Sequence, residues 1–146
     1  MLKQITPKLP LSWEFLKEYK DNPLKFQGIL RDPISTYNHD KLLDKNSINT
    51  RTEYMLNYLG FKNTSNPNVM KIIENKFPYD VERGIHHYVL FINPDLERDY
   101  VNEALIESFI ALKTKEYGFK EYVYFEQPVE RRSLPTITHY HVFFRK

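Results

Sequence analysis

The spacing of apolar and polar positions divides the chain into a helical first half and a second half in which strands flank one long helix. The helices of the first half are marked by caps and prolines more than by continuous apolar stripes. They are predicted at Trp13–Lys20 after the cap Ser12, at Leu24–Leu30 after Asn22-Pro23, from Asp32-Pro33 to about Lys45, and from a capping box at Thr50–Glu53 to Gly60.

The second half alternates between strand and helix patterns. Residues 69–76 fit a short helix or a strand, and both readings stay open. Three segments rich in β-branched and aromatic residues predict strands. These strands are expected at His87–Ile92, Tyr122–Phe125 and Thr136–Phe144, with a basic loop, Gln127–Pro135, before the last of them.

Residues 97–117 predict the longest helix, which Gly118 ends. Apolar residues spaced four, four and three positions apart give this helix one apolar face, which should contact the sheet. The opposite face should be exposed to solvent. The apolar face consists of Val101, Leu105, Phe109 and Leu112, and the opposite face of Glu103, Glu107 and Lys113. We therefore predict an α+β fold in which helices pack on one side of a small, mostly antiparallel sheet.

The length of 146 residues fits one domain, residues 1–146, in which the proline-bearing segment 1–11 forms an extended arm. There is no cysteine, so disulfides and thiolate metal sites are excluded. The sequence has no signal-peptide core and no apolar run of membrane-spanning length. We expect a cytoplasmic protein with no membrane partner.

The net charge of +2 and the pI of about 8.6 are compatible with an RNA partner but are low for a DNA-binding domain, so no DNA partner is expected. Eleven tyrosines and ten phenylalanines reflect either the codon bias of an A/T-rich genome or rings that stack on bases. Only four glycines are present, and no glycine-rich phosphate loop occurs, which excludes a nucleotide-binding P-loop fold.

Two histidines share one face of the last predicted strand. Because side chains alternate along a strand, His139 and His141 lie on the same face as Ile137, Phe143 and Arg145. Such a pair is compatible with metal binding, nucleophilic catalysis, phosphate contact or a structural role. Zinc needs a third ligand that only His86, His87, His39 or a carboxylate would supply, so we predict no metal and no cofactor.

Cationic and aromatic side chains gather around the same strand. Arginine forks and aromatic rings together suit an RNA backbone with splayed bases. The candidate RNA-binding residues are Arg131, Arg132, His139, Tyr140, His141, Arg145, Lys146 and Lys120.

Three segments resemble the N-acetylglucosamine-induced protein 1 family, a domain of unknown function. They are residues 54–61, residues 69–91 with Phe77-Pro78-Tyr79, Gly84-Ile85 and His86-His87, and residues 124–145 with Ser133-Leu134-Pro135 and His139-x-His141-Val142. The family name records how one member is induced and gives no activity. The chain also looks like the compact microsporidian members, which include a ribosome dormancy factor. This resemblance implies a ribosome-associated protein that binds rRNA and ribosomal proteins at the tRNA exit site.

The ending is also similar to that of histidine-triad proteins, which implies a histidine-triad-like fold as an alternative. One triad position is apolar, either Ile137 or Phe143 depending on the register. We therefore expect a binding protein and no catalytic residue. The alternative is a nucleotide hydrolase or transferase that uses His139, His141 and His87, and a third reading, from the family name, is a regulator of sugar metabolism.

Overall fold

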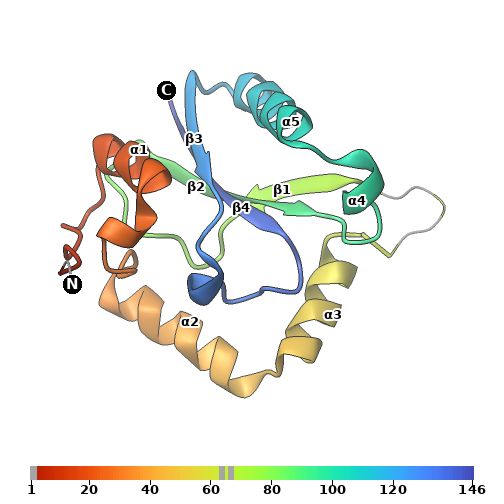
Figure 1. The fold of residues 1–146 in the computed structure, drawn as a ribbon, viewed down its shortest axis with the longest axis horizontal. Coiled ribbons are helices and arrows are strands. Elements are labelled where there is room, and N and C mark those ends of the chain that lie inside the picture. The colour runs from red at the N-terminus through yellow and green to blue at the C-terminus, as the bar shows by residue number, and fades with distance from the viewer. Residues whose placement is uncertain (1–2, 63–64, 66–67) are drawn as a thin grey trace.

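The computed structural model describes residues 3–62, 65 and 68–146, and it has an α+β fold (Figure 1). Three helices come first in the chain, and the four strands all follow them. The elements are α1 (Trp13–Asp21), α2 (Pro33–Lys45), α3 (Ile48–Tyr58), β1 (Met70–Glu74), β2 (His86–Ile92), α4 (Glu97–Tyr100), α5 (Glu103–Glu116), β3 (Glu121–Phe125) and β4 (His139–Arg145), with short 3-10 turns at Pro23–Lys25 and Val129–Arg131.

The caps predicted for α1 and α2 are confirmed. The Ser12 hydroxyl accepts a hydrogen bond from the Phe15 N–H, and the Asp32 carboxylate accepts from the N–H groups of Ile34 and Ser35. Gly60 has φ +72°, the left-handed conformation expected after a helix. Local side-chain chemistry therefore sets these helix boundaries.

The predicted helix at residues 24–30 is wrong, because only the 3-10 turn Pro23–Lys25 forms there. Its backbone groups are used by distant partners. Ile5 pairs with Phe26 in a parallel bridge, and the Arg131 guanidinium donates to the carbonyl groups of Pro23 and Phe26. Gly28 lies against the Arg131 side chain, where a Cβ atom would be only 3.2 Å from its Cδ and Nε atoms.

Two other helix boundaries differ from the prediction. Helix α3 begins earlier than the Thr50–Glu53 capping box, because Ser47 caps it and accepts from the Thr50 N–H. The predicted helix 97–117 is divided into α4 and α5. Between them, Val101 is extended and the Asn102 side chain accepts from the Leu105 N–H, which starts a new helix.

The sheet is antiparallel throughout, with the strand order β1-β2-β4-β3. Residues 69–76, left open by the sequence, contain strand β1. Strand β4 lies between β2 and β3 and begins at His139, later than the predicted start at Thr136. The alternation predicted for this strand is confirmed, because His139, His141 and Phe143 share one face and Tyr140, Val142 and Phe144 share the other.

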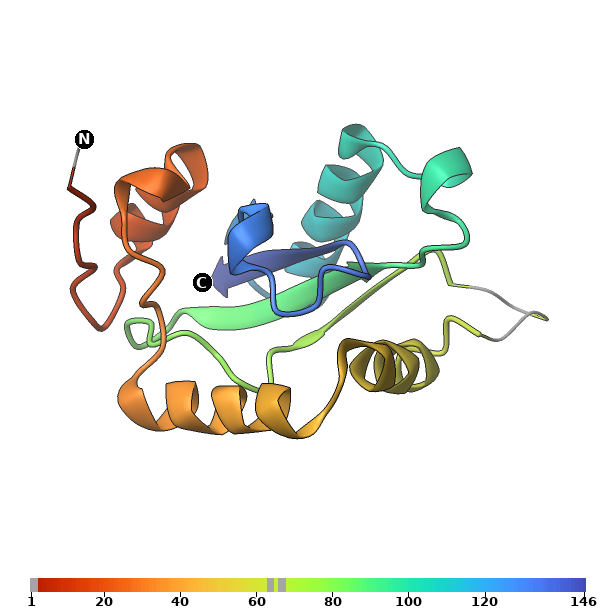
Figure 2. The same ribbon diagram turned by 60° about the horizontal axis from the view of Figure 1, so that its bottom comes forward.

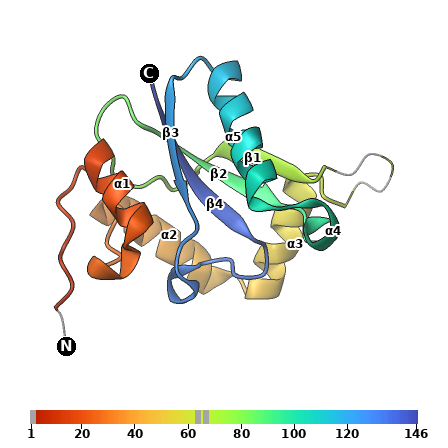
Figure 3. The same cartoon turned by 45° about the horizontal axis from the view of Figure 1, so that its top comes forward.

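Helices cover both faces of the sheet, so the expectation that they pack on one side is wrong. On the Val142 face, α5 closes an apolar core. On the His141 face, α1 packs beside β3 and α3 packs over β2, and Figure 2 shows α2 and α3 on the side of the sheet opposite α5. In Figure 3, β3 lies between α1 and α5.

The apolar face predicted for the long helix is displaced by one residue. Ile106, Ile110 and Thr114 are buried against the sheet, whereas Leu105 and Leu112 are 39% and 61% exposed. Phe109 is partly buried at the edge of this core. Because a new helix begins after Asn102, Val101 lies outside α5 and does not share its buried face.

Residues 3–11, which belong to the segment predicted as an extended arm, lie against the rest of the chain. The Ile5 N–H donates to the Lys25 carbonyl, and the Leu11 N–H donates to the Asp80 carbonyl. Leu11 is fully buried. This segment is therefore part of the folded body; residues 1 and 2 of the predicted arm lie outside the described residues.

Candidate functional site

The register between β2 and β4 brings two histidines together on the face opposite α5. His87 pairs with Phe143, and His141 pairs with Val89. His87 and His141 are therefore diagonal neighbours across the strand pair, a separation that their rings can span. The His87 Nε2 atom lies 2.9 Å from the His141 Nδ1 atom, and both side chains are buried.

The protonation of this pair follows from a single backbone contact. The Tyr79 N–H donates to the His87 Nδ1 atom at 3.0 Å, so Nδ1 carries no proton. In a neutral His87 ring the proton is then on Nε2, which donates to the Nδ1 atom of His141. His141 in turn carries its proton on Nε2, 3.2 Å from the Tyr79 hydroxyl. The hydrogen bonds thus require both rings to be neutral.

The chain of hydrogen bonds continues into the loops. The Tyr79 hydroxyl accepts from the Gln127 side-chain amide at 2.7 Å, and the Tyr19 hydroxyl donates to the Gln127 Oε1 atom at 2.6 Å. The Arg131 guanidinium donates to the Tyr19 hydroxyl at 2.9 Å. We call Tyr19, Tyr79, His87, Gln127 and His141 the histidine network.

Burial sets the protonation equilibria of the network. It holds the pKa of His87 and of His141 well below the usual range, and the positive charge of Arg31 acts in the same direction. Burial also raises the pKa of Tyr79 to about 12. The network is therefore uncharged at neutral pH, which fits a structural or recognition role better than proton exchange with solvent.

His139 lies beside the network and differs from its neighbours. Its Nδ1–H donates to the Ile137 carbonyl at 2.8 Å, and its ring stacks on Phe91. With the proton on Nδ1, the Nε2 atom carries a lone pair. No buried side-chain nitrogen or oxygen among the described residues lacks a partner, so this Nε2 is reachable by solvent. Burial, opposed by the Ile137 hydrogen bond, lowers the pKa of His139.

The three histidines do not surround an open space. The rings of His139 and His141 are 5.8 Å apart, Phe125 packs against His141, and Phe143 stacks on His87. A cleft of about 330 Å³ opens next to Tyr79, with His86 and His87 in its wall, but neither His139 nor His141 lines it. A shared phosphate-sized pocket for the three rings is therefore not formed there.

The predicted RNA-binding residues are divided between the interior and the surface of the protein. Arg131 is held by internal acceptors, and Arg132 pairs with Glu126 at 3.0 Å. Arg145 pairs with Glu121 and lies over the Trp13 ring. Tyr140 is half-buried. The cations that remain exposed are Lys120 and Lys146, so the structure does not gather the predicted residues on one surface.

Several residues of this region were missed from the sequence. Tyr79 and Gln127 belong to segments that carry the family resemblance, which was the available signal for them. Tyr19 contacts Gln127 and Arg131 over more than a hundred residues of sequence, and no local pattern indicates such contacts; Arg131 itself was predicted, but as an RNA-binding residue. Arg31 was also missed, although its guanidinium lies 5.0 Å from the centre of the Tyr79 ring.

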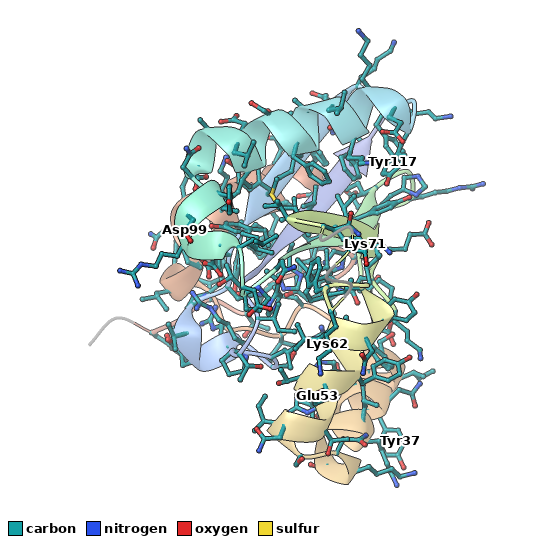
Figure 4. All side chains as sticks on the ribbon, turned by 90° about the vertical axis from the view of Figure 1, so that its right-hand side faces the viewer. Tyr37, Glu53, Lys62, Lys71, Asp99 and Tyr117 are labelled. Carbon is teal, nitrogen blue, oxygen red and sulfur yellow. The ribbon has the colours of Figure 1, made fainter. Side chains whose placement is uncertain are left out.

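Helices α2 and α3 form a second surface of interest, because neither contributes a fully buried residue. Tyr54 and Tyr58 are 60% and 58% exposed, and their rings stack with centroids 6.0 Å apart. Figure 4 shows Tyr37, also exposed, on the part of the molecule farthest from α5. The exposed apolar and aromatic side chains of this α2–α3 surface are Ile34, Tyr37, Leu42, Tyr54 and Tyr58.

The described part of the chain offers neither a metal centre nor a membrane-spanning helix. Within residues 3–62, 65 and 68–146, no three or more acidic or histidine side chains are placed to hold a metal ion. Over the same residues, no helix combines the length and the apolar character that crossing a bilayer requires.

Comparisons with known proteins place the chain in a family. Residues 12–145 match the family described as "Protein of unknown function (DUF3605)", so the chain belongs to this family. No curated protein matches it. A solved structure, "Crystal Structure of HTC1", is similar with a TM-score of 0.60 and 22% sequence identity over 92% of this chain and 85% of that one. This likeness shows a shared fold.

Proposed function

We propose that this member of the family is a ribosome-associated dormancy factor that binds rRNA near the tRNA exit site and holds the ribosome inactive. The α2–α3 surface carries the proposal. It offers exposed rings on which bases stack, with Lys41 lying 5.3 Å from the centre of the Tyr37 ring. Ile34 and Leu42 add apolar area suited to a ribosomal protein. The resemblance to the compact microsporidian members supports the same partner.

This proposal revises the expected contacts with rRNA. Arg131, His139 and His141 make hydrogen bonds inside the protein, so we do not assign them contacts with rRNA. Lys120 and Lys146 remain available for phosphate contacts at the other end of the sheet. The stacked pair Tyr54 and Tyr58 takes the central role that the basic loop held in the sequence-based prediction.

Co-sedimentation of the full chain with purified ribosomes tests the proposal. We expect binding at low salt, weakened about tenfold by Tyr54→Ala or Tyr58→Ala, because stacking on one base contributes roughly 1–3 kcal/mol. Tyr100→Ala is the matched control, since Tyr100 is equally exposed but lies on α4, across the sheet. A protein that stays at the top of the gradient with ribosomes in excess contradicts the proposal.

A second candidate is a histidine-triad-like nucleotide hydrolase or transferase, and the orientation of His139 favours it. The Nε2 lone pair would form an N–P bond while the bond from phosphorus to the leaving group breaks, and the leaving group would depart with the electron pair. Water, or an acceptor hydroxyl in a transferase, would then cleave the N–P bond. With His139 as the nucleophile, the apolar Ile137 takes the first triad position, which counts against this candidate.

A panel of dinucleoside polyphosphates, nucleoside phosphoramidates and sugar nucleotides separates the two candidates. Turnover that disappears in His139→Ala and persists in His86→Ala would favour the enzyme. Mass spectrometry of proteins and RNA captured by the tagged chain separates both from a sugar-metabolism regulator, because only the dormancy factor enriches rRNA together with ribosomal proteins.

A further inference from the structure

Two arginines and a histidine gather around α2, on the side of the sheet that carries the histidine network. Arg31 precedes α2, and Arg51 lies in the first turn of α3. His39 belongs to the stripe of α2 that faces the body of the protein, and its ring packs against Phe77 with centroids 5.7 Å apart. We call Arg31, His39 and Arg51 the cationic cluster.

Positive charge exceeds negative charge at this cluster. Burial lowers the pKa of His39, and the positive charges of Arg31 and Arg51 lower it further. Asp40, whose carboxylate lies 3.6 Å from the His39 Nδ1 atom, opposes them, but its side chain is 62% exposed. Among the described residues, no ion pair of 4 Å or less links Arg31 or Arg51 to a carboxylate.

Both guanidinium groups retain free donors. Arg31 uses its Nε–H in a bond to the Phe77 carbonyl at 2.8 Å. Arg51 uses its Nε–H toward the Asn46 carbonyl at 3.3 Å and one Nη–H toward the Ser133 carbonyl. Both Nη atoms of Arg31 and one of Arg51 have no hydrogen-bond partner among the described residues, and the Arg31 guanidinium lies over the Tyr79 ring. These nitrogens are reachable by solvent, because no buried polar side-chain atom lacks a partner.

We propose that Arg31, His39 and Arg51 form a binding site for a phosphate group, carried by a free nucleotide or pyrophosphate or by an RNA backbone. Guanidinium forks match the geometry of phosphate oxygens, and an imidazolium adds a third donor with positive charge. The backbone bonds from each Nε atom hold the two forks in position before a ligand arrives. The site does not depend on the proposed ribosomal role.

The site should take up a proton when phosphate binds. The groups that face His39 are Arg31, Asp40, Arg51 and, from β4, His141. A bound phosphate group, which is a monoanion in an RNA backbone and more highly charged in pyrophosphate, offsets the repulsion of the two arginines and stabilises the charged imidazole. Phosphate affinity should therefore rise as the pH falls from about 7.5 to about 6.5, toward the ordinary pKa of histidine.

Calorimetry with the full chain tests the site in two arms. One arm titrates inorganic pyrophosphate, and the other a short single-stranded RNA without terminal phosphates, each near pH 6.5 in two buffers of different ionisation enthalpy. We expect Arg31→Gln or Arg51→Gln to weaken binding about tenfold, since each removes a charge-assisted hydrogen bond. His39→Gln should abolish the proton uptake.

Arg83→Gln is the matched control, because Arg83 is exposed and lines a cleft beside Trp13 and Arg145 that none of the three cluster residues lines. Binding of pyrophosphate alone identifies a free phosphate ligand, and binding of RNA with the same sensitivity to the variants identifies a backbone phosphate.

Arg31→Gln also loses its bond to Phe77, so if it lowers the melting temperature, Arg51→Gln and His39→Gln decide the outcome. Absence of binding at millimolar concentration in both arms, or equal weakening by Arg83→Gln, overturns the proposal.

Discussion

Strand β4 presents two different kinds of core on its two faces. Toward α5, Val142 and Phe144 pack with Ile110 in a mainly apolar layer, in which the buried Thr114 hydroxyl donates to the Ile110 carbonyl. Toward the N-terminal helices, His141 joins Tyr79 and Gln127 in a buried polar network. One strand thus supports a face held by apolar contact and a face held by directed hydrogen bonds.

The difference shows how each face specifies its structure. Apolar packing tolerates substitutions that conserve volume, whereas a buried polar network requires every partner in place. The network also links α1, the segment before β2 and the loop before β4, which are far apart in sequence. The apolar face therefore mainly supplies stability, and the polar face fixes how the N-terminal half sits on the sheet.

Ile110→Ala should produce the largest effect, on the apolar face. Ile110 is fully buried, and truncating such a side chain costs about 2–5 kcal/mol of unfolding free energy. Urea denaturation measures the loss. Leu112→Ala on the same helix should cost less than about 0.5 kcal/mol, because Leu112 is exposed. Equal losses in the two variants would contradict the face assigned to α5.

Acid should destabilise the protein through the polar face. The pKa values of His87 and His141 are lowered on folding, so below about pH 6.5 the unfolded chain binds protons that the folded chain does not. Stability is fully present above this pH and falls as the pH decreases, by up to about 1.4 kcal/mol per pH unit for each histidine.

Unfolding free energies at several pH values between about 7.5 and about 5.5, on either side of the ordinary histidine pKa, measure this slope. His141→Phe should make it shallower, whereas His86→Phe, at an exposed position of the same sheet, should leave it unchanged. An unchanged slope in His141→Phe would mean that the network does not control acid stability.

Tyr79→Phe should have the smallest effect of the three. It removes the hydroxyl that meets His141 and Gln127, leaving buried polar groups unpaired, at a cost of about 1–3 kcal/mol. Tyr88→Phe removes a hydroxyl that contacts Glu74 at the surface, and we expect a loss below about 0.5 kcal/mol. Thermal or urea denaturation compares the two variants, and a neutral Tyr79→Phe would show that the network adds no stability.

Much of the fold was predictable where local chemistry decides it. The caps Ser12 and Asp32 defined the starts of α1 and α2, and β-branched and aromatic runs identified the last three strands. Alternation alone places His139 and His141 on one face of β4. Errors arose where two local signals competed, as at Asn102, which starts a new helix inside an otherwise continuous pattern.

The candidate site was only partly predictable. The histidines were identified, but their role as a neutral hydrogen-bonded pair depends on the Tyr79 backbone N–H and on the register of two strands. Arg131 was expected to contact RNA from a basic loop, yet it binds carbonyl groups of residues 23 and 26. A single sequence carries no signal for such a contact.

The sequence by itself determined most of the elements, their approximate limits and the composition of the two faces of the last strand. These depend on caps, prolines and periodicity within a few residues of chain. Only the tertiary structure decided which face each helix covers, which histidine nitrogens carry protons and which arginines stay available to a ligand. Those properties arise from hydrogen bonds and burial between segments as far apart as Tyr19 and Gln127, and the local pattern of residues does not encode that pairing.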